Sequence, residues 1–194
     1  MIERAEGHRP EGRIAIGPAA DRSLVDRARD GDLDAFEQLV RARMDAVYRL
    51  THAIVIDEAD AADAAQETFV AAWRQIRSLR DPARFDAWLQ RIAVNAARMT
   101  LRARRRRTVR EVATSSAVDA TSEQTADASD ASLLTTALHH LSADQRTLLA
   151  LHHLEGRSVA ELAALLEIPA GTVKSRLFTA RQALDAAIAA ERTR

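Results

Sequence analysis

The chain has 194 residues, of which 47% are hydrophobic, 29% charged and 4% aromatic, with 28 basic and 28 acidic side chains and no cysteine. This is a globular composition, and few aromatic residues with much Ala, Leu, Arg and Glu argue against a many-stranded β fold and predict an all-α protein. The lack of cysteine excludes disulfides, thiolate zinc sites and cysteine nucleophiles. No run approaches the roughly 18 apolar residues of a membrane span and the start lacks the apolar core of a signal peptide, so we expect a soluble, cytoplasmic protein.

Composition divides the chain into four parts. Residues 1–20 hold three Gly and two Pro without hydrophobic periodicity, which predicts a flexible tail. Residues 21–110 and 133–194 show helical periodicity and predict two small helical domains. The segment 111–132 between them has five acidic and no basic residues and almost no large apolar side chains, which is typical of a flexible linker.

The first predicted domain begins with two amphipathic helices that are separated at Gly31 and Asp32, where the Asp carboxylate can cap the second helix. A third helix is predicted from Glu58 to about Arg77. Its expected apolar stripe comprises Ala62, Ala65, Phe69, Ala72, Trp73 and Ile76.

The third helix also carries an acidic stripe. We expect its members to share an exposed face that serves either as a solvated surface or as a docking face for a basic protein. A metal site or acid-base pair is disfavoured, because no His or second carboxylate cluster accompanies the stripe at motif spacing. The stripe comprises Asp60, Asp63, Gln66 and Glu67.

A long basic helix is predicted to start at Asp81-Pro82, an N-cap followed by proline, and to continue into an arginine run. Residues 74–110 hold 12 basic and 2 acidic residues, the balance expected of a phosphate-binding surface. One face of this helix carries cations, an amide and an indole at spacings of three and four, which suits a strand opened from a duplex. Trp88 could equally be a core residue, and the arginine run could be either a phosphate clamp or a solubilising helix end. The face comprises Arg84, Trp88, Arg91, Asn95 and Arg98, and the run includes Arg102, Arg105 and Arg106.

The second predicted domain contains two capping boxes, Ser142 to Gln145 and Ser158 to Glu161, and a helix-turn-helix with Ile168 at its corner. Its last helix would be the DNA reader, although the same pattern could be a solvated face. The candidate DNA-binding residues on this helix are Thr172, Lys174, Ser175, Arg176, Phe178 and Arg181.

The remaining motifs predict no further chemistry. The adjacent pairs His139-His140 and His152-His153 point about 100° apart on a helix and are poorly placed to chelate a metal. The sequence has no phosphate-binding glycine loop and no nucleophile motif. We therefore expect no cofactor, no metal and no enzymatic activity.

Three segments resemble bacterial extracytoplasmic-function sigma factors. DAADAAQETFVAAW (60–73) is similar to the core-polymerase-binding helix of that family. FDAWLQRIAVNAARMTLRARRR (85–106) looks like the segment that reads and melts the minus-ten element. Residues 141–184 look like the domain that reads the minus-thirty-five element, and GTVKSRLFTAR (171–181) is the most specific piece of that match.

The resemblance implies a promoter-specific initiation factor with an acidic docking stripe and a basic strand-binding face. It implies a pocket for a flipped base at the loop that ends in Arg80. It also implies three partners: core RNA polymerase, promoter DNA as duplex and melted non-template strand, and an anti-sigma or other inhibitory protein. The alternative is a stand-alone helix-turn-helix regulator.

Overall fold

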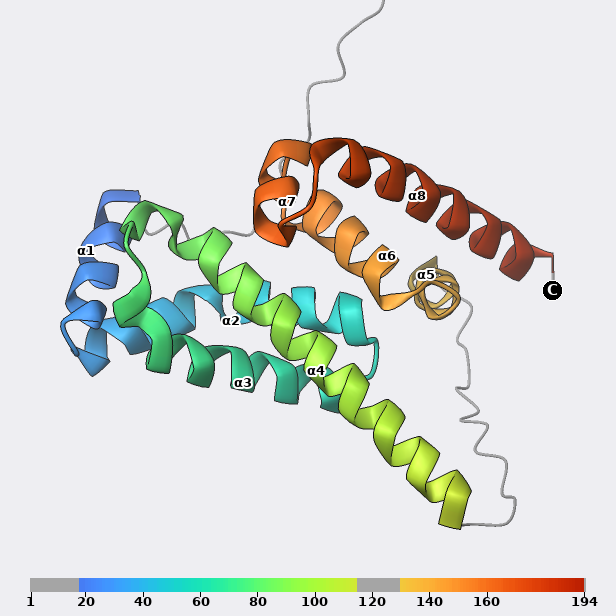
Figure 1. The fold of residues 1–194 in the computed structure, drawn as a ribbon, viewed down its shortest axis with the longest axis horizontal. Coiled ribbons are helices and arrows are strands. Elements are labelled where there is room, and N and C mark those ends of the chain that lie inside the picture. The colour runs from blue at the N-terminus through green and yellow to red at the C-terminus, as the bar shows by residue number, and fades with distance from the viewer. Residues whose placement is uncertain (1–17, 115–129, 194) are drawn as a thin grey trace, which may run out of the picture.

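The computed structural model describes residues 18–114 and 130–193, where all regular structure is helical (Figure 1). This agrees with the predicted all-α class. None of the described helices is both long and apolar enough to cross a membrane. The elements are α1 (Pro18–Arg29), α2 (Leu33–Val55), α3 (Glu58–Gln75), the 3-10 turns η1 (Ile76–Ser78) and η2 (Pro82–Arg84), α4 (Phe85–Thr114), α5 (Asp130–His139), α6 (Ala143–Leu149), the π-helical turn η3 (Ala150–Leu154), α7 (Val159–Leu166) and α8 (Ala170–Arg192).

The first four helices pack around α2, which contacts α1, α3 and α4. The predicted break between α1 and α2 is confirmed: Gly31 has φ +100° and the Asp32 carboxylate accepts from the amide of Ala35 at 3.0 Å. Asp57 caps α3 in the same way, through the amide of Asp60. These caps satisfy free amides in the first turns of the two helices.

The predicted apolar stripe of α3 is wrong at Ala62, which is exposed, whereas Ala61 and Ala64 are fully buried. Alanine occupies so many positions in this helix that the pattern of side chains does not reveal which of them face the core. The orientation of α3 that buries Ala61 agrees with a hydrogen bond to α2, a contact that the sequence pattern does not predict. The buried hydroxyl of Thr51 on α2 donates to the carbonyl of Ala61 at 3.0 Å.

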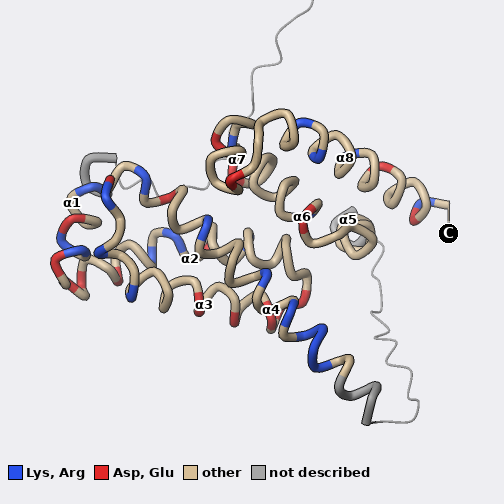
Figure 2. Tube along the Cα trace, in the orientation of Figure 1, with Lys and Arg blue, Asp and Glu red and all other residues tan. Residues whose placement is uncertain are grey.

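The long basic helix starts later than predicted. The Asp81 carboxylate accepts from the amide of Ala83 and caps η2, so Asp81-Pro82 open a short 3-10 turn and α4 begins at Phe85. The helix then continues through the arginine run, as predicted, for 30 residues, or roughly 45 Å at the usual helical rise. Its C-terminal end projects away from the other helices (Figure 1) and carries a cluster of basic residues (Figure 2).

The C-terminal half contains the predicted helix-turn-helix, formed by α7 and α8. Both predicted capping boxes are present, with reciprocal bonds between Ser142 and Gln145 and between Ser158 and Glu161. The turn after α7 is made at Glu167, which is left-handed with φ 57°. The preceding α6 ends in a π-helical turn rather than directly at Gly156.

The predicted tail and linker lie mostly outside the described residues. The described part of the tail, residues 18–20, begins α1. Helices extend into both ends of the predicted linker, because α4 reaches Thr114 and α5 begins at Asp130.

The two halves share one hydrophobic core. A single cluster of buried side chains includes Leu50 and Ile54 of α2 together with Leu148 and Leu151 of the C-terminal half. Contacts join α2 to α6 and η3, and α4 to α7. The halves therefore form one packed unit in this structure.

Arg146 joins the two halves through backbone carbonyls. Its side chain is buried and donates to the carbonyls of Ile54 at 2.7 Å, Leu141 at 2.6 Å and Leu138 at 3.2 Å. Ile54 lies in the last turn of α2, where carbonyls lack partners within the helix. Burial lowers the pKa of the guanidinium, and no carboxylate among the described residues pairs with it.

Arg146→Met should destabilise the protein by about 2 to 4 kcal/mol, because three buried carbonyls lose their donor. The measurement is urea unfolding followed by circular dichroism. Arg41→Met is the control: Arg41 is 78% exposed and, among the described residues, pairs with Glu37, so its removal should cost less than about 0.5 kcal/mol. Equal losses in the two variants would contradict the role of Arg146.

Glu161→Gln should keep the capping box but remove its pH dependence. Three donors, the Ser158 amide, the Ser158 hydroxyl and Arg157, lower the pKa of Glu161 from 4.5 to about 2. The ionised carboxylate therefore stabilises the fold fully above pH 4.5 and less as the pH falls toward 2. The difference in unfolding free energy between wild type and variant should shrink over that range; a constant difference would contradict it.

Candidate nucleic-acid interface

The predicted reader helix, α8, presents its polar side chains to solvent. Lys174, Ser175, Arg176 and Arg181 are exposed, and Thr172 is half-buried. No ion pair within the described residues engages the three cations. Phe178 is 62% exposed, a large apolar side chain left in water on the same helix. The core side of α8 is made by Val173, Leu177 and Ala180.

The predicted strand-binding face of α4 converges on one cavity. The cavity has a volume of about 420 Å³ and is lined on the α4 side by Trp88, Arg91, Asn95 and Arg98, which confirms that these four residues share a face. The prediction is wrong for Arg84, which belongs to η2 rather than to α4 and does not line the cavity. Trp88 combines the two alternatives considered for it. The indole packs against the core and lies 5.9 Å from the ring of Phe85, yet it also lines the cavity.

The opposite wall of this cavity belongs to the helix-turn-helix, through Leu165, Leu166 and Glu167. Arg91 Nη1 donates to Glu167 Oε1 at 2.8 Å. Nearby, Arg98 Nη2 donates to Asp144 Oδ1 at 2.9 Å. The C-terminal half therefore lies across part of the face expected to bind a single strand, while Arg91 and Asn95 on that face stay exposed.

A polar bridge beside the cavity escaped the sequence analysis. The buried amide of Gln90 on α4 donates to Glu155 at 2.6 Å and accepts from Arg157 at 2.8 Å. The partners lie 65 and 67 positions along the chain. Nothing in the local sequence signals a pairing over that separation.

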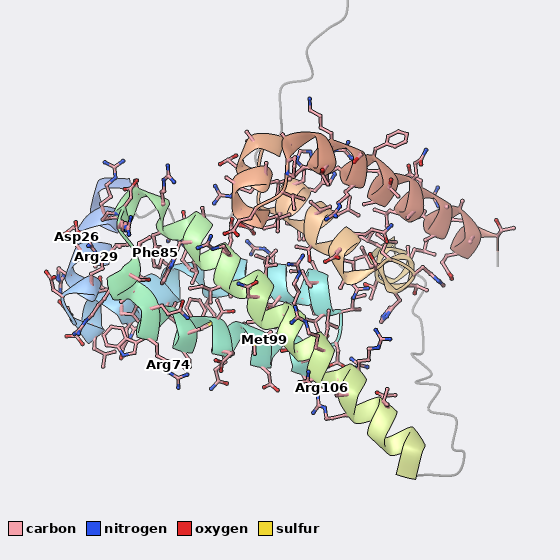
Figure 3. All side chains as sticks on the ribbon, in the orientation of Figure 1. Asp26, Arg29, Arg74, Phe85, Met99 and Arg106 are labelled. Carbon is pink, nitrogen blue, oxygen red and sulfur yellow. The ribbon has the colours of Figure 1, made fainter. Side chains whose placement is uncertain are left out.

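The basic residues from Arg102 to Arg107 on α4, and those of the loop before it, are exposed. Arg80 and Arg84 precede α4, and Arg84 pairs weakly with Asp81 at 3.6 Å. Farther along, Met99 is 65% exposed; Figure 3 labels it on α4 between Phe85 and Arg106. An open hollow near the end of the helix is lined by Arg102, Arg105, Arg106 and Val109.

The acidic stripe of α3 is only partly exposed. Asp63, Gln66 and Glu67 are exposed, and neither carboxylate has an ion-pair partner within the described residues. Asp60 departs from the expected exposed stripe, because its carboxylate is 17% exposed and pairs with Arg104 at 3.2 Å and Arg107 at 3.6 Å. The basic end of α4 and the acidic start of α3 thus neutralise each other in part.

The histidine pairs form no metal cluster. Across the described ranges, 18–114 and 130–193, no three His, Asp or Glu side chains gather at a spacing that could hold a metal ion. His152 instead contacts the carbonyl of Arg157 at 2.8 Å through Nδ1. Its ring meets that of His153 edge-on at 4.8 Å.

Two segments of the chain match known protein families. Residues 39–107 match the family described as Sigma-70 region 2 and residues 131–184 match Sigma-70, region 4. The chain is also 35% identical over 181 residues to the RNA polymerase sigma-H factor of Pseudomonas aeruginosa, covering 87% of this chain and 93% of that one. It is 34% identical over 182 residues to the ECF RNA polymerase sigma-E factor of Escherichia coli K12, covering 85% and 92%.

Solved structures of similar proteins agree with these sequence matches. The structure of CnrH in complex with the cytosolic domain of CnrY matches with a TM-score of 0.64 and 31% identity over 88% of this chain and 97% of that one. The sigma factor RpoE in complex with the anti-sigma factor NepR from Bartonella quintana matches with a TM-score of 0.62 and 28% identity over 79% and 96%. With its region 2 and region 4 segments both present, this chain belongs to the extracytoplasmic-function sigma factors of bacterial RNA polymerase.

Proposed function

We propose that the protein is an alternative sigma factor that binds core RNA polymerase, directs it to specific promoters and assists the opening of the duplex. The observation that carries this proposal is the presence of regions 2 and 4 on one chain. The distribution of charge supports it: residues 21–73 hold 12 acidic and 6 basic side chains and residues 74–110 hold 2 acidic and 12 basic ones, which suits two different partners. We assign residues 21–110 to the region 2 domain and residues 133–194 to the region 4 domain.

The polymerase-docking site is assigned to the exposed part of the acidic stripe. Asp63, Gln66 and Glu67 lie on the outer face of α3. Unpaired carboxylates on a rigid helix attract a basic partner and are penalised little on docking, because they give up no internal ion pair. Asp60 would join this site only by exchanging its pairs with Arg104 and Arg107.

The reader helix is assigned to the upstream promoter element. Lys174 can donate to guanine acceptors in the major groove, and the exposed ring of Phe178 can pack against a thymine methyl. Arg176 and Arg181 can bind phosphates and fix the helix in its register. At the start of α8 no side chain caps the first amides, which leaves them available to a phosphate oxygen.

The downstream element is assigned to α4 and the loop before it. Trp88 and Asn95 offer stacking and hydrogen bonding to bases of a melted strand, while Arg91 and Arg98 offer charge to its phosphates. Arg80 and Arg84 extend the site at one end, and Arg102, Arg105 and Arg106 extend it at the other. In the structure, carboxylates of the C-terminal half pair with Arg91 and Arg98, and α7 lies across the cavity from Trp88, so the assigned role requires these two ion pairs to be released.

The proposal includes an inhibitory protein partner, no cofactor and no enzymatic activity. CnrH and RpoE, both similar to this chain, were solved in complex with CnrY and with the anti-sigma factor NepR. Because RNA polymerase works in the cytoplasm, we place the protein there. A stand-alone regulator is not favoured, because such a protein would have no use for a region 2 segment.

The docking assignment predicts the effect of a double variant, Asp63→Arg with Glu67→Arg. It should bind bacterial core RNA polymerase at least about tenfold more weakly, because two attractive charges become repulsive. The measurement is gel filtration with core polymerase, with circular dichroism to check folding. Asp45→Arg with Asp185→Arg is the control, since both carboxylates are exposed, lie outside the stripe and give the same charge change. Unchanged affinity of the first variant would contradict the assignment.

The reader assignment predicts a promoter-selective loss. Lys174→Ala with Ser175→Ala should reduce run-off transcription about tenfold or more on promoters selected from fragmented genomic DNA by the wild type. Asp185→Ala, farther along the same helix, should leave transcription unchanged. Equal loss on templates from which the upstream element has been deleted would show that Lys174 and Ser175 do not read bases.

A further inference from the structure

Carboxylates of the C-terminal half occupy two cations of the face assigned to the melted strand. Glu167 and Asp144 accept from Arg91 and Arg98 at 2.8 and 2.9 Å. They come from two separate elements, the turn of the helix-turn-helix and the first turn of α6. Carboxylate and phosphate oxygens bind guanidinium groups in the same way. These two carboxylates therefore take places that strand phosphates would take.

The backbone at Glu167 adds a second observation. Its left-handed conformation, φ 57°, is one that glycine or asparagine adopts at the end of a helix with less strain. Burial does not account for a glutamate there, since the side chain is 74% exposed. Among the described residues, the polar contact of its carboxylate is with Arg91. Glu167 thus supplies a negative charge that pairs with Arg91 on the face of α4.

The cavity beside these pairs shows what the arrangement covers. Trp88 and Asn95 form its α4 wall, and Leu165 and Leu166 of α7 form the opposite one. A strand that stacks on the indole from this side must therefore enter between α4 and α7. Meanwhile Lys174 and Phe178 of the reader helix stay exposed.

We propose that Asp144 and Glu167 form a latch that holds region 4 over the strand-binding face and competes with single-stranded nucleic acid for Arg91 and Arg98. This inference rests on the proposed function of that face. Both ion pairs are open to solvent and therefore weak and sensitive to salt. A strand carrying many phosphates can displace them, whereas an isolated anion competes poorly.

The test compares two double variants with equal net charge. Asp144→Asn with Glu167→Gln removes the latch, and Asp45→Asn with Asp185→Asn removes two exposed carboxylates that make no contact between the halves. The probe is a fluorescein-labelled single-stranded DNA of 20 nucleotides and mixed sequence, titrated by anisotropy with the full-length chain. The latch variant should bind about two- to thirtyfold more tightly than the control variant, the range expected when two exposed ion pairs are removed.

A distance measurement distinguishes separation of the two halves from a simple gain in the electrostatic attraction of the strand. The chain has no cysteine, so Arg41→Cys on α2 and Gln182→Cys on α8, both at exposed positions, can carry a donor and an acceptor dye. Strand binding should lower the transfer efficiency between the dyes. The midpoint of this fall in transfer efficiency should lie at a lower strand concentration in the latch variant than in the control variant.

Three outcomes would overturn the latch: equal strand affinity in the two variants, strand binding without a change in transfer efficiency, or no strand binding by any of the proteins. In the last case there would be nothing for the carboxylates to compete with. Co-elution with core RNA polymerase tests the proposed function separately. A chain that co-elutes but shows any of the three outcomes remains a sigma factor without a latch.

Discussion

The packing of the two halves depends on a single buried cation, Arg146. Its guanidinium donates to the carbonyl of Ile54 at the end of α2, to that of Leu138 in the last turn of α5 and to that of Leu141 in the turn that follows α5. A buried arginine without a carboxylate is costly unless its donors are used. Here three carbonyls take up donors of the guanidinium, and one of them lies across the interface at the end of α2. Leu148 and Leu151, which follow Arg146 along the chain, belong to the core that the two halves share.

Because Arg146 binds backbone carbonyls, its contacts do not depend on the residue types that surround it at the interface. A carbonyl is present whatever side chain stands at positions 54, 138 and 141, so the contact constrains helix positions more than residue types. By contrast, the bridge from Gln90 to Glu155 and Arg157 requires particular side chains on both halves. The interface therefore combines one contact to the backbone with several that depend on the exact sequence.

Local signals in the sequence predicted local structure well. The cap at Asp32, both capping boxes and the continuation of α4 through the arginine run all follow from residues within a few positions of each other. The face shared by Trp88, Arg91, Asn95 and Arg98 follows from helical spacing alone. These features depend on backbone geometry that neighbouring residues set by themselves.

The errors arose where partners are distant in the chain. The rotation of α3 depends on which alanines approach α2, and alanines at successive positions look alike in sequence. The ion pairs of Asp60 with Arg104 and Arg107, and the cover over the α4 face, join residues more than forty positions apart. Helical periodicity contains no information on such pairs, because it repeats within a turn or two.

The exposed α8 and the ion-paired cations of α4 have a consequence for the choice between RNA and DNA, given the roles proposed for the two helices. An open surface of arginines and an indole binds single strands through phosphates and stacking, and neither contact distinguishes RNA from DNA strongly. In this structure Arg91 and Arg98 each pair with a carboxylate of the C-terminal half, so an RNA strand must displace those carboxylates, whereas Lys174 and Phe178 stand exposed without such partners among the described residues. On the roles proposed for the two surfaces, the packed arrangement selects against transcripts more than against duplex DNA.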